Sequence, residues 1–126
     1  MAGAVINPEV ELVDFRGDSC LKFTFRGHLT SEDAELGVKE WRDFFNSTGG
    51  EKVVVIWDST QMTGFDNKAR IIWQHAIKEM KSQIECVWLI TDSKVIKAGA
   101  KLMSLFTSFC LKVVDSSDKI AFSVLI

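Results

Sequence analysis

Short apolar runs alternate along this chain with segments in which apolar residues recur every third or fourth position. Residues 53–57 are an uninterrupted apolar run that ends on Asp58, and residues 86–90 and 111–114 form two further runs. A continuous apolar run is typical of a strand buried on both faces, and such strands usually belong to parallel sheets with helices on both sides. The pattern therefore predicts an α/β fold.

Apolar stripes at helical spacing between these strands predict three helices. A start signal precedes each of them. Thr30 with Asp33 resembles a capping box, and Asp66 and Ser93 stand at the other two helix starts. The predicted helices run from Thr30 to about Asn46, from Asp66 to Ile84, and from Ser93 to Phe109.

The N-terminal part shows the alternation of a half-exposed hairpin. Glu9–Phe15 and Cys20–Arg26 are the two predicted strands, joined by a turn at residues 16–19. The element order is then β-β-α-β-α-β-α-β, and right-handed crossovers make the later strands parallel. We expect a mixed sheet with a parallel core and an antiparallel N-terminal hairpin, in a single domain over residues 1–126. Residues 119–126 are predicted to be either a short helix or an edge strand.

Composition and charge exclude several classes of protein. The net charge is −2 and the sequence pI is about 5.7, without a cluster of basic residues, so nucleic-acid binding is not expected. No apolar run reaches the roughly 18 residues of a membrane span, and the N-terminus lacks the pattern of a signal peptide. Cys20, Cys86 and Cys110 lie in apolar segments without metal-binding spacing, which indicates buried thiols in a reducing compartment. We expect a cytoplasmic protein.

The element order and the segment from Asp58 to Asp66 resemble STAS domains, the fold of bacterial anti-anti-sigma factors and of sulfate-transporter tails. Within that group the chain is most similar to small stand-alone SpoIIAA-like proteins, whose fold is also compared with lipid-binding Sec14 (CRAL-TRIO) domains. The anti-anti-sigma members end their central strand with Asp-Leu-Ser and open the next helix with Asp-Ser-Ser-Gly, whose second serine is phosphorylated. Here Asp58-Ser59-Thr60 matches the strand end and Asp66 matches the aspartate, but Asn67, Lys68 and Ala69 replace Ser-Ser-Gly. The resemblance therefore implies a regulatory, partner-binding domain that lacks the usual phosphoacceptor serine.

Polar clusters at the predicted strand ends suggest an alternative chemistry. Asp58, Asp92 and Asp115 would share one edge of a parallel sheet, an arrangement that suggests a metal or phosphoryl-transfer site. The same residue types also satisfy free N–H groups at helix starts and turns, which is the more common use. The sequence shows no phosphate-binding glycine loop, no recognisable catalytic triad and no zinc-ligand spacing. We therefore expect no enzyme activity, no metal site and no cofactor.

The third predicted helix is apolar around most of its circumference. Its polar stripe consists of three lysines and two serines and is too narrow for a helix that simply covers a sheet. Three interpretations are open. The helix is buried between the sheet and its neighbours, including the apolar tail; or it forms a dimer or partner surface anchored by Met103, Phe106 and Phe109; or it gates an apolar ligand cavity or touches a membrane.

The sequence thus predicts a non-enzymatic STAS-like module that acts in regulation by binding a protein partner, as a homodimer. The alternative is a carrier or sensor of a lipid or another apolar small molecule, held in a cavity under the third helix. In both cases the expected contact surface combines the strand end, the start of the second helix and the third helix. Its residues are Asp58, Ser59, Thr60, Asp66, Asn67, Lys68, Arg70, Ile71, Met103, Phe106 and Phe109.

Overall fold

The computed structural model describes residues 7–15 and 18–120, which form one five-stranded sheet and three α-helices. The strands are β1 (Glu9–Phe15), β2 (Asp18–Leu29), β3 (Val53–Phe65), β4 (Ile84–Ile90) and β5 (Leu111–Val114). The helices are α1 (Ser31–Ser47), α2 (Asn67–Met80) and α3 (Lys94–Thr107), with short 3₁₀ turns at Lys81–Gln83 and Ser117–Lys119.

The strands lie in the order β1-β2-β3-β4-β5 across the sheet. β1 and β2 pair in antiparallel fashion, and the three other neighbouring pairs are parallel. The predicted fold, a mixed sheet with a parallel core and an antiparallel N-terminal hairpin, is confirmed.

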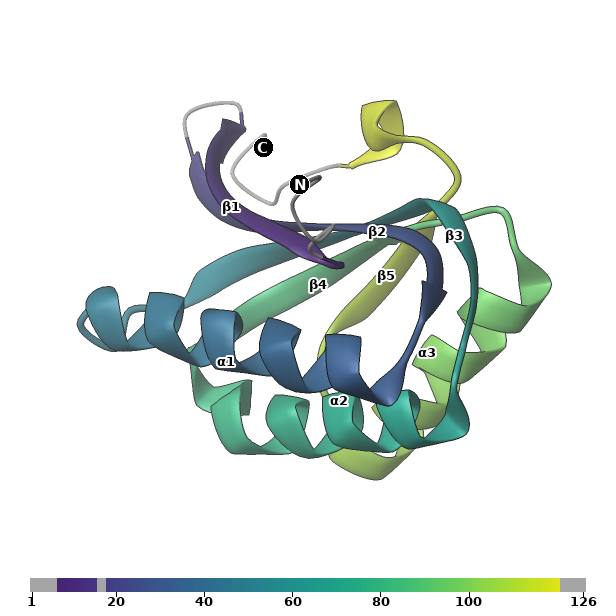
Figure 1. The fold of residues 1–126 in the computed structure, drawn as a ribbon. Coiled ribbons are helices and arrows are strands. Elements are labelled where there is room, and N and C mark those ends of the chain that lie inside the picture. Colours follow the sequence, from purple (N-terminus) through teal and green to yellow (C-terminus); the bar gives the residue numbers. More distant parts are fainter. Residues whose placement is uncertain (1–6, 16–17, 121–126) are drawn as a thin grey trace, which may run out of the picture.

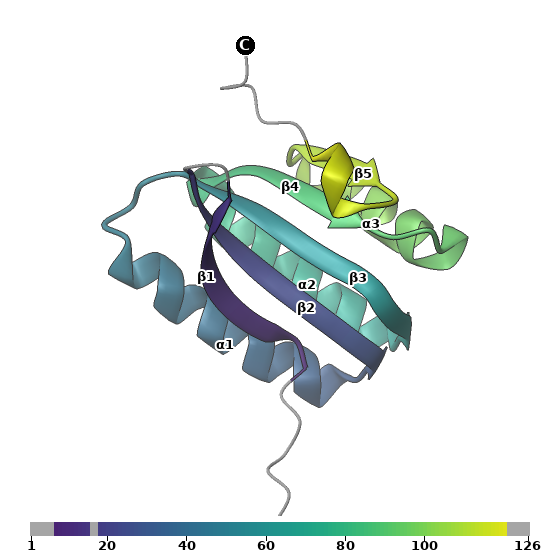
Figure 2. The same cartoon turned by 90° about the horizontal axis from the view of Figure 1, so that it is seen from above.

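All three helices cover the same face of the sheet. Figure 1 shows them side by side below the strands, and Figure 2, seen from above, shows them beneath the sheet. α2 lies between α1 and α3. The strand order gives the reason, because each crossover advances one strand in the same direction, and right-handed crossovers of that kind place every helix on one side. The expectation of helices on both faces is therefore wrong.

The sheet is nevertheless apolar on both faces, as the continuous apolar runs predict. The larger cluster joins the helices to the face that carries Phe23, Val55 and Trp57. The opposite face holds a smaller cluster that includes Ile120, which is 1% exposed. Its other buried members are Cys20, Val54, Ile56, Trp88 and Ile90.

Several predicted boundaries shift in the structure. The predicted strand end at Asp58 and helix start at Asp66 leave a loop between them, but β3 continues for seven residues beyond Asp58 and this segment is strand. α2 ends at Met80, and Ile84 begins β4 instead of ending the helix. β5 has the predicted bounds. Most of the predicted tail element, and part of the turn at residues 16–19, fall outside the described residues.

Local hydrogen bonds mark the helix starts. The hydroxyl of Thr30 accepts the N–H of Asp33 at 3.1 Å, and the Asp33 carboxylate accepts the N–H of Thr30 at 3.1 Å, so the predicted capping box is confirmed. The hydroxyl of Ser93 accepts the N–H of Ile96 at 3.3 Å. Asp66 stands at the N-cap position of α2, but its side chain makes no capping bond.

The prediction of three unlinked cysteines is wrong, because Cys86 and Cys110 form a disulfide. They lie just before the paired residues Val87 and Leu111, so the register of β4 against β5 brings them together, with their Cα atoms 4.7 Å apart. Their sequence separation of 24 gave no recognisable spacing motif. Cys20 is a buried thiol. Among the described residues, no helix is long and apolar enough to cross a membrane.

Candidate functional site

β2 and β3 extend past the rest of the sheet. β4 pairs with β3 only as far as Asp58, whereas β2 remains paired to β3 as far as Phe65. The register of this pair shifts twice, and such irregularities bend strands and increase their twist. Figure 1 shows the two strands curving down toward the helices. We call the paired segments 26–29 and 61–65 the β2–β3 extension.

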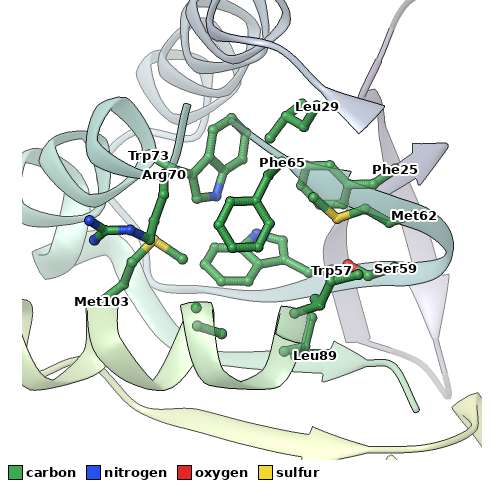
Figure 3. Close-up of a pocket in the computed structure, with 13 residues that line it drawn as sticks. Phe25, Leu29, Trp57, Ser59, Met62, Phe65, Arg70, Trp73, Leu89 and Met103 are labelled. Carbon is green, nitrogen blue, oxygen red and sulfur yellow. The ribbon is translucent and has the colours of Figure 1, made fainter. Parts of the chain in front are cut away.

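A pocket lies between this extension, the sheet, α2 and α3 (Figure 3). Its volume is about 50 Å³, roughly that of one or two water molecules. It is the cavity under the third helix that the sequence predicted for an apolar ligand. Its walls come from the sheet (Trp57), the extension (Met62 and Phe65), α2 (Arg70 and Trp73) and α3 (Met103).

Phe65 closes the pocket between the extension and α3. A Cβ atom on Gly99 of α3 would lie 2.6 Å from Cζ of Phe65, so glycine at this position leaves room for the ring. In the view of Figure 3 the Phe65 ring lies between the indoles of Trp73 and Trp57. A ligand that extends toward Gly99 therefore has to displace this ring.

Two buried hydrogen-bond donors belong to the pocket wall. Trp57 and Trp73 are each 3% exposed, and Nε1 of each has no hydrogen-bond partner within the described part of the chain. A buried N–H without an acceptor costs about 1–3 kcal/mol. The same holds for Nε1 of Trp41, whose ring centroid is 5.4 Å from that of Trp73, but Trp41 does not line the pocket. Both N–H groups of the pocket wall are covered in the present packing, so an acceptor reaches them only when neighbouring side chains move.

Arg70 adds a positive charge to the same wall. Its guanidinium donates to the Asn67 side-chain oxygen at 3.1 and 3.3 Å and to the Gln74 side-chain oxygen at 3.0 Å. Both partners are neutral, and among the ion pairs of the described residues none includes Arg70. In Figure 3 the guanidinium points away from Phe65 and Trp57. A guanidinium binds carboxylates with paired hydrogen bonds, so Arg70 is suited to an anionic group at the rim of the pocket.

A polar pair ties the extension to the start of α2. Nε2 of His28 lies 2.7 Å from a carboxylate oxygen of Asp66, and both side chains are about half exposed. The hydrogen bond from His28 holds the pKa of Asp66 below its ordinary value. Sequence reasoning placed Asp66 as a helix cap and assigned no role to His28. No local signal shows this contact, because it depends on the register that sets His28 beside Gly64.

The three residues at the predicted strand end lie within β3, where its register against β2 shifts. Ser59 is 3% exposed and lines the pocket. Asp58 accepts hydrogen bonds from the backbone N–H and the hydroxyl of Thr60, at 3.1 and 2.7 Å. Of this group, only Ser59 contributes to the pocket.

The proposed edge of three aspartates does not form one cluster. Asp58 bonds locally to Thr60, and Asp115 pairs with Lys119 at 2.9 Å, which holds the pKa of Asp115 below its ordinary value. Within the described residues no group of three His, Cys, Asp or Glu side chains could hold a metal ion.

The three predicted contact residues on or near α3 differ in their exposure. Met103 is buried in the pocket wall, and Phe109, just beyond the helix, is 7% exposed with its ring centroid 6.0 Å from that of Trp57. Neither is a surface anchor. Phe106, by contrast, is 66% exposed. On α2, Lys68 and Ile71 are also exposed.

The interpretation that α3 is buried all round is wrong. Its inner face packs on the sheet, but Val95, Leu105 and Phe106 are each at least 66% exposed on the outer face. Ile120, the described residue of the expected apolar cover, lies in the cluster on the other face of the sheet. α3 therefore combines a pocket wall with an exposed apolar surface.

Comparison with known proteins defines the fold but not the site. No family model and no curated protein matches this sequence. The crystal structure of an uncharacterised DUF3478 protein from Shewanella loihica PV-4, described as having a SpoIIAA-like fold, matches with a TM-score of 0.75. The fold is SpoIIAA-like. The match covers 94% of each chain at 17% sequence identity, so the likeness extends to the fold alone.

Proposed function

We propose that this protein is a non-enzymatic binding module that takes up a small apolar carboxylic acid in the pocket between the β2–β3 extension, α2 and α3. The observation that carries the proposal is that three residues lining an apolar pocket carry hydrogen-bond donors. The buried indole N–H groups of Trp57 and Trp73 lack acceptors within the described chain, and Arg70 lacks an acidic partner there. A carboxylate has two oxygens that accept several hydrogen bonds, and an apolar body suits the aromatic wall.

The pocket in its present form is small. Its volume of about 50 Å³ is smaller than the roughly 300 Å³ at which pockets for drug-sized ligands begin. Binding requires the Phe65 ring to leave its place against Gly99. The extension that carries Phe65 pairs only with its own neighbour and not with β4, so movement there leaves the central sheet intact. Ligand uptake therefore alters the packing of Phe65 against Gly99 in the first half of α3.

The test compares acids with their neutral amides. Phenylacetate and phenylacetamide have nearly the same shape, as do octanoate and octanamide, but only the acids carry charge. A hydrogen bond to a charged group contributes about 1.5–3 kcal/mol, so isothermal titration should show the acid binding roughly ten- to a hundredfold more tightly. Arg70→Gln should remove that preference.

Lys68→Gln is the matched control, since Lys68 is an exposed cation two residues away that does not line the pocket. It should leave the preference for the acid unchanged. Equal affinity for acid and amide, or no heat from any of the four compounds, would contradict the proposal.

A second candidate function is a protein-interaction module that acts in regulation. It is favoured by the exposed apolar surface of α3, where Phe106 lies open to solvent, beside the second half of α2. Asn67 and Lys68 occupy the places of the phosphorylated serine segment in the resembling family, so regulation would not use that modification. Lys68→Glu should weaken binding of a protein partner while the denaturation midpoint stays unchanged.

A further inference from the structure

The outward surface of the helical layer carries nearly all the exposed large apolar side chains. Six of the seven in the described residues lie on the three helices, and the seventh, Leu12, lies on β1. Four of the six lie on α3, where Leu102, Leu105 and Phe106 are neighbours at helical spacing, and an exposed apolar patch on a small protein marks an interaction site. The six are Leu36 on α1, Ile71 on α2, and Val95, Leu102, Leu105 and Phe106 on α3.

Charge on this surface is divided between its two edges. α1 carries five acidic and two basic side chains and is acidic on balance; the exposed ones are Glu32, Glu35 and Asp43 together with Lys39 and Arg42. α3 carries three lysines and no acidic side chain, and Lys94 and Lys101 are exposed. α2 lies between them, so one edge of the layer is acidic and the other basic. The surface is complementary to itself.

We infer that a second copy of this chain docks on the helical layer, with a two-fold axis running along α2. Each helix follows a strand of the same direction, so the three run side by side in the same sense. Rotation about an axis along α2 exchanges the positions of α1 and α3. The acidic α1 of each copy then faces the basic α3 of the other, twice, as an isologous dimer requires. This inference rests on the interaction function and not on the ligand pocket.

The net charges of α1 and α3 favour this arrangement, although an axis along α2 also brings the exposed Lys68 and Lys78 of α2 near their copies. An axis that crosses the helices at right angles would place α3 against α3, with lysines facing lysines. An anionic membrane would attract α3 but repel the acidic α1 in the same layer. A second copy places opposite charge against both α1 and α3 and covers the apolar side chains between them.

The test uses two charge-reversed proteins. In the first, the three lysines of α3 become glutamate; in the second, Glu32, Glu35 and Asp43 of α1 become lysine. In sedimentation velocity, wild type should be a dimer at tens of micromolar, and each variant alone should be a monomer. An equimolar mixture of the two should form the heterodimer, because each contact again joins opposite charges. No other occupant predicts that rescue.

Leu105→Glu, which buries a charge at the proposed contact, should weaken the dimer at least about tenfold. Leu12→Glu is its matched control, since Leu12 is 56% exposed on β1 and Leu105 is 79% exposed on α3. Far-ultraviolet circular dichroism shows that each variant is folded. A monomeric wild type overturns self-association but leaves the surface open to another protein. Self-association through this surface is also overturned if the dimer persists in both charge-reversed variants. It is overturned as well if wild type binds phosphatidylserine vesicles and does not dimerise.

Discussion

The two ends of the helical layer are built differently. At the end where α3 finishes, the Cys86–Cys110 disulfide joins β4 to the segment after the helix, and the Lys81 ammonium donates to the carbonyl of Thr107 at 3.0 Å. These contacts fix the last turn of α3 to the sheet. We call this the fixed end.

The other end, where α2 and α3 begin, holds the pocket and the β2–β3 extension. Here the connections are the half-exposed His28–Asp66 pair and the contact of Phe65 with Gly99. The difference shows how one helix serves two purposes. α3 is held covalently at one end, so its first turns and the extension are the parts left to respond to a ligand. We call this the pocket end.

Breaking the disulfide should give the largest effect on stability. A loop closed between cysteines 24 positions apart corresponds to about 3 kcal/mol of unfolding free energy in the chain-entropy model. Urea denaturation of the protein with and without a reducing agent should show a loss of that order, and Cys110→Ser should match the reduced form.

Counting thiols checks the bond itself. Alkylation of the unfolded, unreduced protein should modify one cysteine, Cys20, and reduction should raise the number to three. Three modified cysteines without reduction would show that the fixed end has no covalent link.

A methyl group at the pocket end should have a smaller effect. In Gly99→Ala the new Cβ meets the Phe65 ring at 2.6 Å, and such crowding costs about 1–3 kcal/mol, against a gain of about 1 kcal/mol in helix propensity. The net loss expected in urea denaturation is therefore about 1 kcal/mol.

In a Phe65→Ala background the clash is absent, so the same substitution should stabilise the protein by the propensity gain alone. A double-mutant cycle measures this change of sign. If Gly99→Ala is equally stabilising with and without the ring, Phe65 does not close the pocket against α3.

The smallest expected effect concerns pH. The folded-state pKa of Asp66 is lowered by His28, so this pair stabilises the protein at pH values above the ordinary aspartate pKa of about 3.9. The contribution is lost as the pH falls through the lowered value. The thermal midpoint of wild type should therefore drop more steeply below about pH 4 than that of Asp66→Asn.

His28→Gln should make the thermal midpoint fall less steeply below about pH 4, because it removes the hydrogen bond that lowers the pKa of Asp66. The Asp115–Lys119 pair also has a lowered carboxyl pKa but is unchanged in these variants, so it cancels in the comparison. Parallel acid profiles for wild type and Asp66→Asn would show that the pair does not hold the extension.

Much of the fold follows from local sequence signals, whereas the pocket does not. The apolar runs at residues 53–57 and 86–90 predict buried strands, and Thr30 with Asp33 predicts the start of α1. The polar residues Asp58, Ser59, Thr60 and Thr63 suggested a loop, but pairing with β2 holds that segment as strand. Tertiary pairing overrode the local preference there.

The site depended on contacts that no local pattern specifies. The disulfide, the His28–Asp66 pair and the fit of Phe65 on Gly99 each join segments brought together by sheet register or helix packing. The sequence suggested an apolar ligand cavity under the third helix as an alternative, and a small pocket lies against that helix. It named Arg70 as a surface contact and assigned no role to the indoles, because their burial without acceptors appears only in three dimensions.

The most direct test of the pocket is the nuclear magnetic resonance signal of each tryptophan indole N–H during titration with phenylacetate. The chain has four tryptophans, of which Trp57 and Trp73 line the pocket and Trp88 lies in the cluster on the opposite face of the sheet. The indole signals of Trp57 and Trp73 should move as acceptors reach them, while that of Trp88 stays in place. Unchanged signals for Trp57 and Trp73, or equal shifts for all four, would contradict ligand binding at this site.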